Sequence, residues 1–217
     1  MKLLILAVPV CAVVLTAQVA DYANSGYRTA EGRAKVAGGL SSHDREQTQK
    51  PGELVKRLNL DPGMTVADIG TGVGFMLPYL SEAVGPQGKV VAEDIFDDFL
   101  EKAKASAAAK QLSNVEFVHG TVKDPKLPEA AADVVFVLDA YHHFDFPAEM
   151  LAGLRAGLKP GGRLVIVDFY KNQYRDPDHL RLDEKDVIKE IEANGFQLIS
   201  SSAFTPDRQY LAEFRKK

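Results

Sequence analysis

Short runs of β-branched residues alternate with longer helical stretches along most of the chain. This alternation is typical of a parallel sheet covered by helices, because each pair of parallel strands needs a crossover connection. Right-handed crossovers leave few topologies. The sequence therefore predicts an α/β fold with a doubly wound, mostly parallel, seven-stranded sheet and helices on both faces. The predicted strands are 65–70, 89–95, 115–120, 133–139, 163–169, 196–201 and 208–215.

The first forty residues differ from the rest of the chain. Residues 1–20 place one Lys before a long apolar run, a pattern typical of a secretory signal peptide or, if uncleaved, a membrane anchor. Residues 21–40 mix Gly, Ala, Ser and charged residues, which predicts a flexible tether. Residues 41–217 are expected to form one domain. We expect an exported or periplasmic protein, membrane-associated through residues 1–20 if that segment is uncleaved, with a cytoplasmic location as the alternative.

Charge and cysteine content exclude several classes of partner. The net charge of −4 comes without a stripe of Lys and Arg, so we expect no nucleic-acid partner. The one cysteine, Cys11, lies in the apolar N-terminal segment and offers no thiolate metal site to the domain. Because His43, His119 and His179 show no ligand spacing, the sequence predicts no metal site.

A glycine-rich turn follows the first predicted strand, in the segment VADIGTGVG at 66–74. Such turns often bind phosphate, but the dinucleotide pattern needs a third glycine where this chain has Phe75. Asp68, just before Gly70, is expected to repel a pyrophosphate. A nucleoside-like ligand with cationic groups removes both objections. S-adenosylmethionine, with its sulfonium, ammonium and ribose, is such a ligand.

With these motifs, the sequence resembles the class I S-adenosylmethionine-dependent methyltransferases over most of residues 45–200. The glycine-rich turn matches the first motif of that family, and VVAEDI matches the second. ADVVFVLDAYHHF and LRAGLKPGGRLVIVDF are similar to its fourth-strand and fifth-strand segments. The resemblance, which extends to a bacterial subgroup with an export-like N-terminus, implies a Rossmann-like methyltransferase fold. It also implies methyl transfer to a small-molecule or side-chain acceptor.

The resemblance also implies a set of cofactor-binding residues. Asp94 sits where the family binds the ribose hydroxyls with a carboxylate. Where the family often has an acid that binds adenine, this chain has Thr121 after Gly120, so we expect adenine to meet Thr121 or backbone atoms. The expected cofactor-binding residues are Asp68, Gly70, Thr71, Gly72, Gly74, Asp94, Ile95, Gly120, Thr121 and Asp139.

The segment DAYHHF after the fourth predicted strand is where we expect the chemistry to occur. Methyl transfer is an in-line displacement, so the protein mainly positions the acceptor and, where needed, removes a proton. His142, Asp139 and Tyr141 are the candidate bases. Neighbouring residues of an extended turn point in opposite directions, so His142 and His143 are not expected to act on one atom.

Two other functions stay open at this point. An NAD(P)-dependent oxidoreductase is disfavoured by Asp68 and Phe75, because it needs an anion site at the glycine-rich turn. A non-catalytic S-adenosylmethionine-binding module keeps that turn without needing a proton acceptor, and fold alone does not distinguish it from an enzyme.

Overall fold

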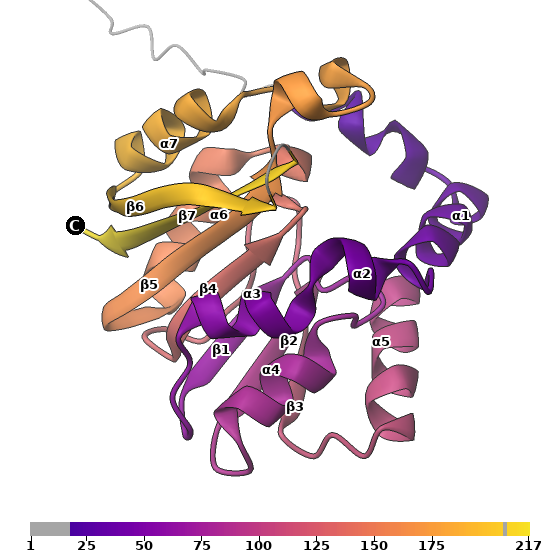
Figure 1. Ribbon diagram of the computed structural model, residues 1–217, viewed down its shortest axis with the longest axis vertical. Helices are drawn as coiled ribbons and strands as arrows, with labels where there is room; N and C mark the ends of the chain where they lie inside the picture. The colour runs from indigo at the N-terminus through magenta and orange to yellow at the C-terminus, as the bar shows by residue number, and fades with distance from the viewer. Residues whose placement is uncertain (1–17, 206–207) are drawn as a thin grey trace, which may run out of the picture.

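A seven-stranded sheet with the order β3-β2-β1-β4-β5-β7-β6 forms the centre of the molecule (Figure 1). The computed structural model describes residues 18–205 and 208–217. The strands are β1 (Thr65–Ile69), β2 (Lys89–Asp94), β3 (Val115–His119), β4 (Ala132–Leu138), β5 (Leu158–Phe169), β6 (Phe196–Thr205) and β7 (Gln209–Lys216). The seven predicted strands are confirmed as elements, and most of their bounds agree within a few residues.

The sheet is mixed rather than uniformly parallel. Strands β1 to β5 pair in parallel, whereas β7 runs antiparallel to both β5 and β6. The physical reason is the short connection between β6 and β7, which is long enough for a hairpin but not for a crossover. The prediction of a mostly parallel sheet therefore holds only for the first five strands.

Helices cover both faces of the sheet. Leucines of α3 and α4 and alanines of α5 pack on one face, whereas α6 and α7 pack on the other. This arrangement confirms the doubly wound architecture. The helices are α1 (Ala30–Leu40), α2 (Arg45–Gln49), α3 (Pro51–Leu58), α4 (Leu77–Val84), α5 (Asp97–Ala109), α6 (Pro147–Gly157) and α7 (Glu184–Ala193), with short 3-10 helices η1 (Ala23–Tyr27), η2 (Tyr141–His143), η3 (Lys171–Gln173) and η4 (Pro177–His179).

The predicted flexible tether at 21–40 is wrong, because this segment forms η1 and α1 and packs on the domain. The Thr29 hydroxyl accepts a hydrogen bond from the Gly32 N–H at 3.0 Å and caps α1. Arg33 then pairs with Asp98 of α5 at 2.8 Å. Single polar contacts of this kind leave no apolar periodicity in the sequence, so composition alone suggested a linker.

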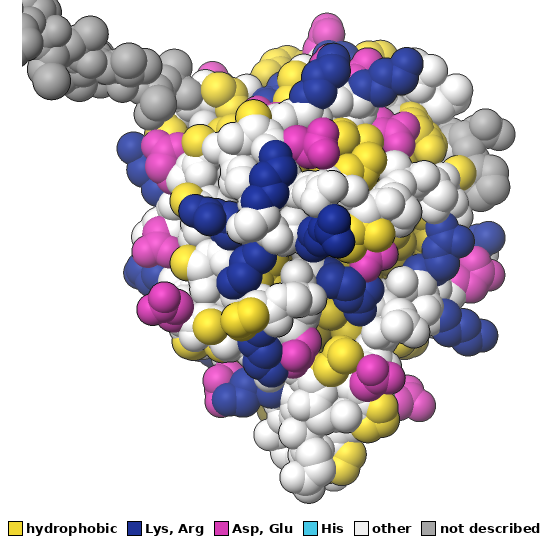
Figure 2. All heavy atoms as spheres, turned by 90° about the vertical axis from the view of Figure 1, so that its left-hand side faces the viewer, with side chains coloured by type: hydrophobic (Ala, Val, Ile, Leu, Met, Phe, Trp, Pro, Cys, Tyr) yellow, Lys and Arg dark blue, Asp and Glu magenta, His cyan; other side chains and the backbone are white. Residues whose placement is uncertain are grey.

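The predicted signal peptide or anchor at 1–20 lies outside the described residues except for its last three. Among the described residues, no helix combines the length and the apolar character needed to cross a membrane. On the face shown in Figure 2, Lys and Arg side chains are interspersed with Asp and Glu.

Candidate cofactor and acceptor site

A cavity of about 710 Å³ opens at the carboxyl ends of the parallel strands. Its walls come from the turn after β1, the end of β2, the loop after β4 and the N-terminal segment. Strand order reverses between β1 and β4, and ligands of doubly wound sheets bind at such a switch point. The volume lies within the range of about 300 to 1,000 Å³ usual for cofactor and small-molecule sites. The fold thus places one ligand cavity at the end of the sheet where the motifs meet.

The glycine-rich turn forms the floor of this cavity. Gly70 and Gly72 both line it and both have positive φ, 70° and 57°, a conformation that other residues rarely adopt. A Cβ on Gly70 would also lie 2.8 Å from the Cβ of Ala140. Gly74, by contrast, does not line the cavity, and a Cβ there would meet Leu77 and Ala103. Gly74 therefore serves close packing against α5 rather than ligand binding.

Asp68 stabilises the glycine-rich turn from its buried side and does not face the cavity. Its side chain is 3% exposed, does not line the cavity, and accepts a hydrogen bond from the Thr71 hydroxyl at 2.7 Å. Burial raises the pKa of Asp68 to about 6. The prediction that Asp68 meets the ligand directly is therefore wrong in its geometry. Thr71 does line the cavity, as predicted.

Asp94 lies at the end of β2 with its carboxylate in the cavity wall. Its two oxygens accept hydrogen bonds from the Gly72 N–H at 2.8 Å and the Phe96 N–H at 3.0 Å. Each carboxylate oxygen keeps a second lone pair for a ligand hydroxyl. Burial raises the pKa of Asp94 to about 6, which the backbone hydrogen bonds only partly offset. The neighbouring Ile95 lines the cavity, as predicted.

The loop after β3 contributes Thr121, which lines the cavity, but not Gly120. A Cβ on Gly120 would overlap the carboxylate of Glu93. Glu93 is buried, and its Oε1 has no hydrogen-bond partner among the described residues. Burial raises the pKa of Glu93 well above its ordinary value. Gly120 is thus needed to make room for Glu93, a cavity-lining acid outside the predicted set of cofactor-binding residues.

Asp139, at the end of β4, is held by two amide side chains. Gln209 Nε2 donates to its Oδ1 at 2.6 Å, and Gln49 Nε2 donates to its Oδ2. Asp139 has a φ of 52°, which costs a non-glycine residue about 1 kcal/mol. Burial raises the pKa of Asp139 to about 6. Its predicted place in the cavity is confirmed, and each of its oxygens already accepts one amide hydrogen bond.

His142 faces the cavity and is paired with a carboxylate behind it. The Nδ1–H of its ring lies 2.8 Å from Asp168 Oδ1, and both side chains are buried. Burial alone would lower the pKa of His142, but the charge and hydrogen bonds of Asp168 outweigh it and raise that pKa. A histidine held in this way presents Nε2 in a fixed direction.

Tyr141 points away from the cavity, so its prediction as a candidate base is wrong. The residue is 1% exposed, and its hydroxyl donates to Glu190 of α7 at 2.6 Å. Burial and the Glu190 charge raise the pKa of Tyr141 above its ordinary value. The reason is that η2 is helical, so successive side chains leave in different directions around its axis.

Tyr141→Phe is therefore expected to change stability and leave the cavity intact. The lost hydrogen bond to Glu190 should lower the free energy of unfolding by about 1 to 2 kcal/mol. Urea unfolding measures that loss, and calorimetry with S-adenosylmethionine should give an unchanged dissociation constant. A higher dissociation constant for S-adenosylmethionine would show that Tyr141 contributes to the site.

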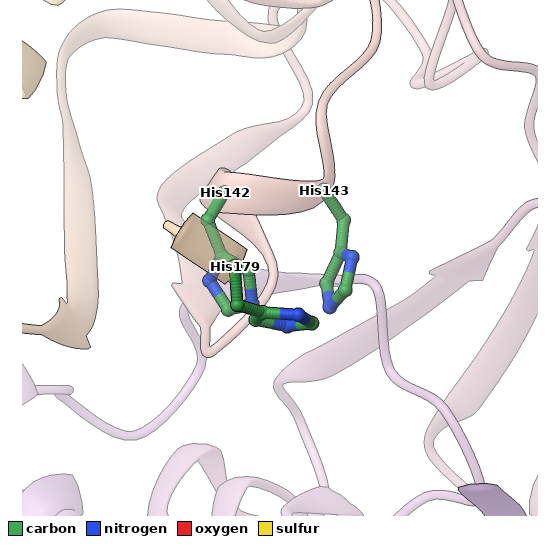
Figure 3. A group of neighbouring side chains, drawn as sticks. All are labelled: His142, His143 and His179. Carbon is green, nitrogen blue, oxygen red and sulfur yellow. The ribbon is translucent and has the colours of Figure 1, made fainter. Parts of the chain in front are cut away.

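The side chains of His142 and His143, which are neighbours in η2, lie close together. The expectation that they point in opposite directions is therefore wrong. The ring centroids of His142 and His143 lie 4.1 Å apart, and His179 of η4 lies 5.1 and 5.4 Å from them. Figure 3 shows the three rings turned toward one another. Since residues 141–143 form a 3-10 helix rather than an extended turn, the alternation of side chains does not apply.

Other cavity-lining residues carried no motif that the sequence reasoning used. The guanidinium of Arg45 lies 4.4 Å from the centroid of the Phe75 ring, close to the charges of Asp68 and Asp139. Tyr27 of η1 stacks on Phe96 at 5.7 Å. Only the fold shows that Arg45, Tyr27 and Phe96 belong to the site, because the chain folds back over the ends of the strands and brings them to the cavity wall.

Comparison with known proteins agrees with this geometry. The profile of the family described as "Methyltransferase domain" matches residues 60–206. Demethylmenaquinone methyltransferase of Lactococcus lactis is 32% identical over 116 residues, which cover 54% of this chain and 46% of the relative. The ubiquinone/menaquinone biosynthesis C-methyltransferase UbiE of Ectopseudomonas mendocina is 32% identical over 111 residues, 51% of this chain and 43% of the relative. The chain thus spans about half the length of these curated relatives.

A solved structure extends the similarity over most of the chain. The S-adenosylmethionine-dependent methyltransferase from Aquifex aeolicus superposes with a TM-score of 0.78 at 28% identity, covering 84% of this chain and 97% of that one. The chain belongs to the methyltransferase-domain family and has the class I, Rossmann-like fold of S-adenosylmethionine-dependent methyltransferases. S-adenosylmethionine is the cofactor of this class, and the NAD(P)-dependent alternative is not favoured.

Proposed function

We propose that the protein transfers the methyl group of S-adenosylmethionine to a small-molecule acceptor bound in the same cavity. The observation that carries this proposal is the composition of the cavity wall. One part is built from Gly70, Gly72 and Asp94, and another from His142 and the aromatic rings of Phe169 and Tyr174. Cofactor and acceptor can thus lie side by side.

The acceptor is proposed to be a small aromatic molecule rather than a protein side chain. The N-terminal segment contributes Asn24, Tyr27 and Arg33 to the cavity wall, which restricts access for a folded protein. Phe169 and Tyr174, with ring centroids 4.8 Å apart, offer apolar faces for an aromatic ring. The curated relatives named above are called quinone methyltransferases, which supports the same choice.

The charges of the cavity fit a cationic cofactor. Glu93, Asp94 and Asp139 all line it, and burial raises the pKa of each carboxyl group. Burial of several carboxyl groups without a cation disfavours their ionised forms. A sulfonium or ammonium group beside them favours the ionised forms again. Arg45 is a cavity-lining cation suited to the carboxylate of the cofactor. The acids thus select a positively charged nucleoside over a dinucleotide.

The dissociation constant of S-adenosylmethionine is expected to rise as the pH falls through 6. Above that pH, Asp94 and Asp139, each with a pKa of about 6, are mostly ionised before the cofactor arrives. Below it, the cationic cofactor must displace a proton from each, which weakens binding by about 10-fold per group between pH 7 and pH 5. Calorimetry in buffers of different ionisation enthalpy measures both the affinity and the released protons.

Asp139→Asn is the matched variant for this measurement, because it keeps the shape and removes one of the two titrating groups. Its affinity should fall less steeply with acid. A dissociation constant that is flat between pH 7 and pH 5 for the parent protein would contradict the role assigned to these carboxylates.

Of the three candidate bases, His142 is the one we propose to face the acceptor. Tyr141 lies outside the cavity, and both oxygens of Asp139 are held by amides. Methyl transfer needs an aligned acceptor and a dry site more than a strong base, since the methyl carbon is already activated. His142 and the surrounding aromatic rings provide the alignment.

The proposal is tested by incubating the protein with isotopically labelled S-adenosylmethionine and a panel of phenols, hydroquinones and short peptides. Mass spectrometry should show label in an aromatic product together with stoichiometric S-adenosylhomocysteine. Label in peptides alone would overturn the small-molecule acceptor. Cofactor binding without any product across the panel and a cell extract would favour a binding module.

A further inference from the structure

Three histidine side chains from two separate segments converge beside the acceptor part of the cavity. His142 and His143 come from η2, His179 comes from η4, and one ring nitrogen of each lies within 4.8 Å of the others (Figure 3). His142 and His143 line the cavity itself. Among the described residues this is the one group with metal-ligating potential of that kind.

Two of the histidines are oriented from behind by oxygen acceptors. Asp168 accepts from His142 Nδ1–H at 2.8 Å, and Asn24 Oδ1 accepts from His143 Nδ1–H at 2.9 Å. Histidines that bind metal ions almost always donate their other ring N–H to such a carboxylate or carbonyl group, which fixes the ring and leaves Nε2 as ligand. The Tyr27 hydroxyl lies 3.5 Å from His143 Nε2, too far to hold that nitrogen firmly.

We propose that His142, His143 and His179 bind a divalent transition-metal ion, zinc by the nature of the donors, with an open position facing the methyl acceptor. Three neutral imidazoles and one open position are the ligand set of many catalytic zinc sites. Zn–N bonds of about 2.0 to 2.1 Å in a tetrahedral site place the nitrogens about 3.3 Å apart. Since the ring nitrogens lie up to 4.8 Å apart, the rings need to close by up to about 1.5 Å. His179 lies in a short 3-10 helix, and its ring stacks on that of Tyr174 with centroids 5.4 Å apart, so the two rings would shift together.

The open position defines the chemical class of the acceptor, an inference that rests on the proposed function. A metal ion favours the ionised form of a bound oxygen. A phenolic acceptor bound there loses its O–H proton to solvent. Its electron pair, on oxygen or on a ring carbon, then forms the bond to the methyl carbon while the C–S bond breaks and its pair returns to sulfur. Attack through carbon also releases the proton of that carbon.

This reading differs from one in which His142 acts alone as a base. A lone base needs neither His143 nor His179, whereas a metal site needs all three rings. The two readings therefore predict different results for His179, which lies outside the cavity wall.

The test is a zinc titration of the full chain after removal of metal with a chelator, followed by cobalt substitution. We expect one zinc ion per chain and, with Co²⁺, the intense visible absorption of a four-coordinate site. His179→Ala and His143→Ala should each weaken zinc binding by at least about 100-fold, since even partners of ligands contribute about 10- to 100-fold. Asp168→Asn, which changes the partner of a ligand, should weaken zinc binding by about 10- to 100-fold.

His43→Ala is the matched control, because His43 is an exposed histidine outside the cavity wall. It should bind zinc like the parent chain. The melting temperature of each variant shows whether it is folded. Equal zinc affinity of the parent and His179→Ala, or no zinc binding by the parent, would overturn the site.

Binding of S-adenosylmethionine and methyl transfer are measured separately on metal-free and zinc-loaded protein. The metal-free protein should bind the cofactor normally and transfer methyl groups slowly. Equal rates with and without zinc would overturn the role of the metal toward the acceptor while leaving the proposed methyltransferase function intact. Zinc binding without methyl transfer under any condition would sustain the metal site and refute that function.

Discussion

A chain that begins at Ser41 is expected to bind S-adenosylmethionine about 100-fold more weakly than a chain that begins at Gln18. The shorter chain lacks η1 and α1, whose residues Asn24, Tyr27 and Arg33 line the cavity. Loss of the Tyr27 ring from its stack on Phe96 costs about 1 kcal/mol. Exposure of the remaining cavity to water and loss of the contacts to His143 and Asp98 supply the rest of about 2.7 kcal/mol.

Calorimetry on the two chains measures this difference, and their melting temperatures show whether the shorter one is folded. A single substitution distinguishes the loss of cavity contacts made by residues 18–40 from a general loss of stability. Tyr27→Ala should weaken binding by about 5-fold, which corresponds to about 1 kcal/mol. Glu31→Ala, at an exposed position on α1 outside the cavity wall, should not change it. Equal affinity of the two chains would show that residues 18–40 do not form part of the site.

Asp94→Ala is expected to weaken binding of S-adenosylmethionine by about 1.5 to 3 kcal/mol, which is about 10- to 150-fold. Its carboxylate lies in the cavity wall with a free lone pair on each oxygen, suited to the two ribose hydroxyls. The same carboxylate accepts from the Gly72 and Phe96 N–H groups, so the melting temperature should also fall.

Asp97→Ala is the matched control for this variant. Asp97 is a nearby acid at the start of α5, its side chain is 76% exposed, and it does not line the cavity. It should leave the affinity for the cofactor unchanged. If Asp94→Ala binds S-adenosylmethionine as tightly as the parent, the ribose contact is wrong and Glu93 becomes the acid to test.

The location of the protein in the cell stays a prediction. It depends on residues 1–20, of which the first seventeen lie outside the described part of the chain. The sequence pattern there predicts export or anchoring, and neither the fold nor the cavity bears on it.

Much of the fold was predictable because its signals are local. A strand of a parallel sheet is a short apolar run, and the run itself records that both faces are buried. The turn at Gly70 and Gly72 was predictable for a similar reason, since positive φ is a property of a single residue. The position of Asp94 followed from the end of a recognisable strand. The sequence alone determined these features.

Tertiary structure alone decided which side chains meet in the cavity. Gln49 and Gln209 hold Asp139 from α2 and β7, and His179 joins His142 from a separate loop. These partners are far apart along the chain, and no periodicity records their meeting. The directions of Tyr141, His142 and His143 depended on a 3-10 turn whose residues read equally well as extended. Chain reversal across the ends of the strands, which depends on the packing of the whole domain, brings these side chains together.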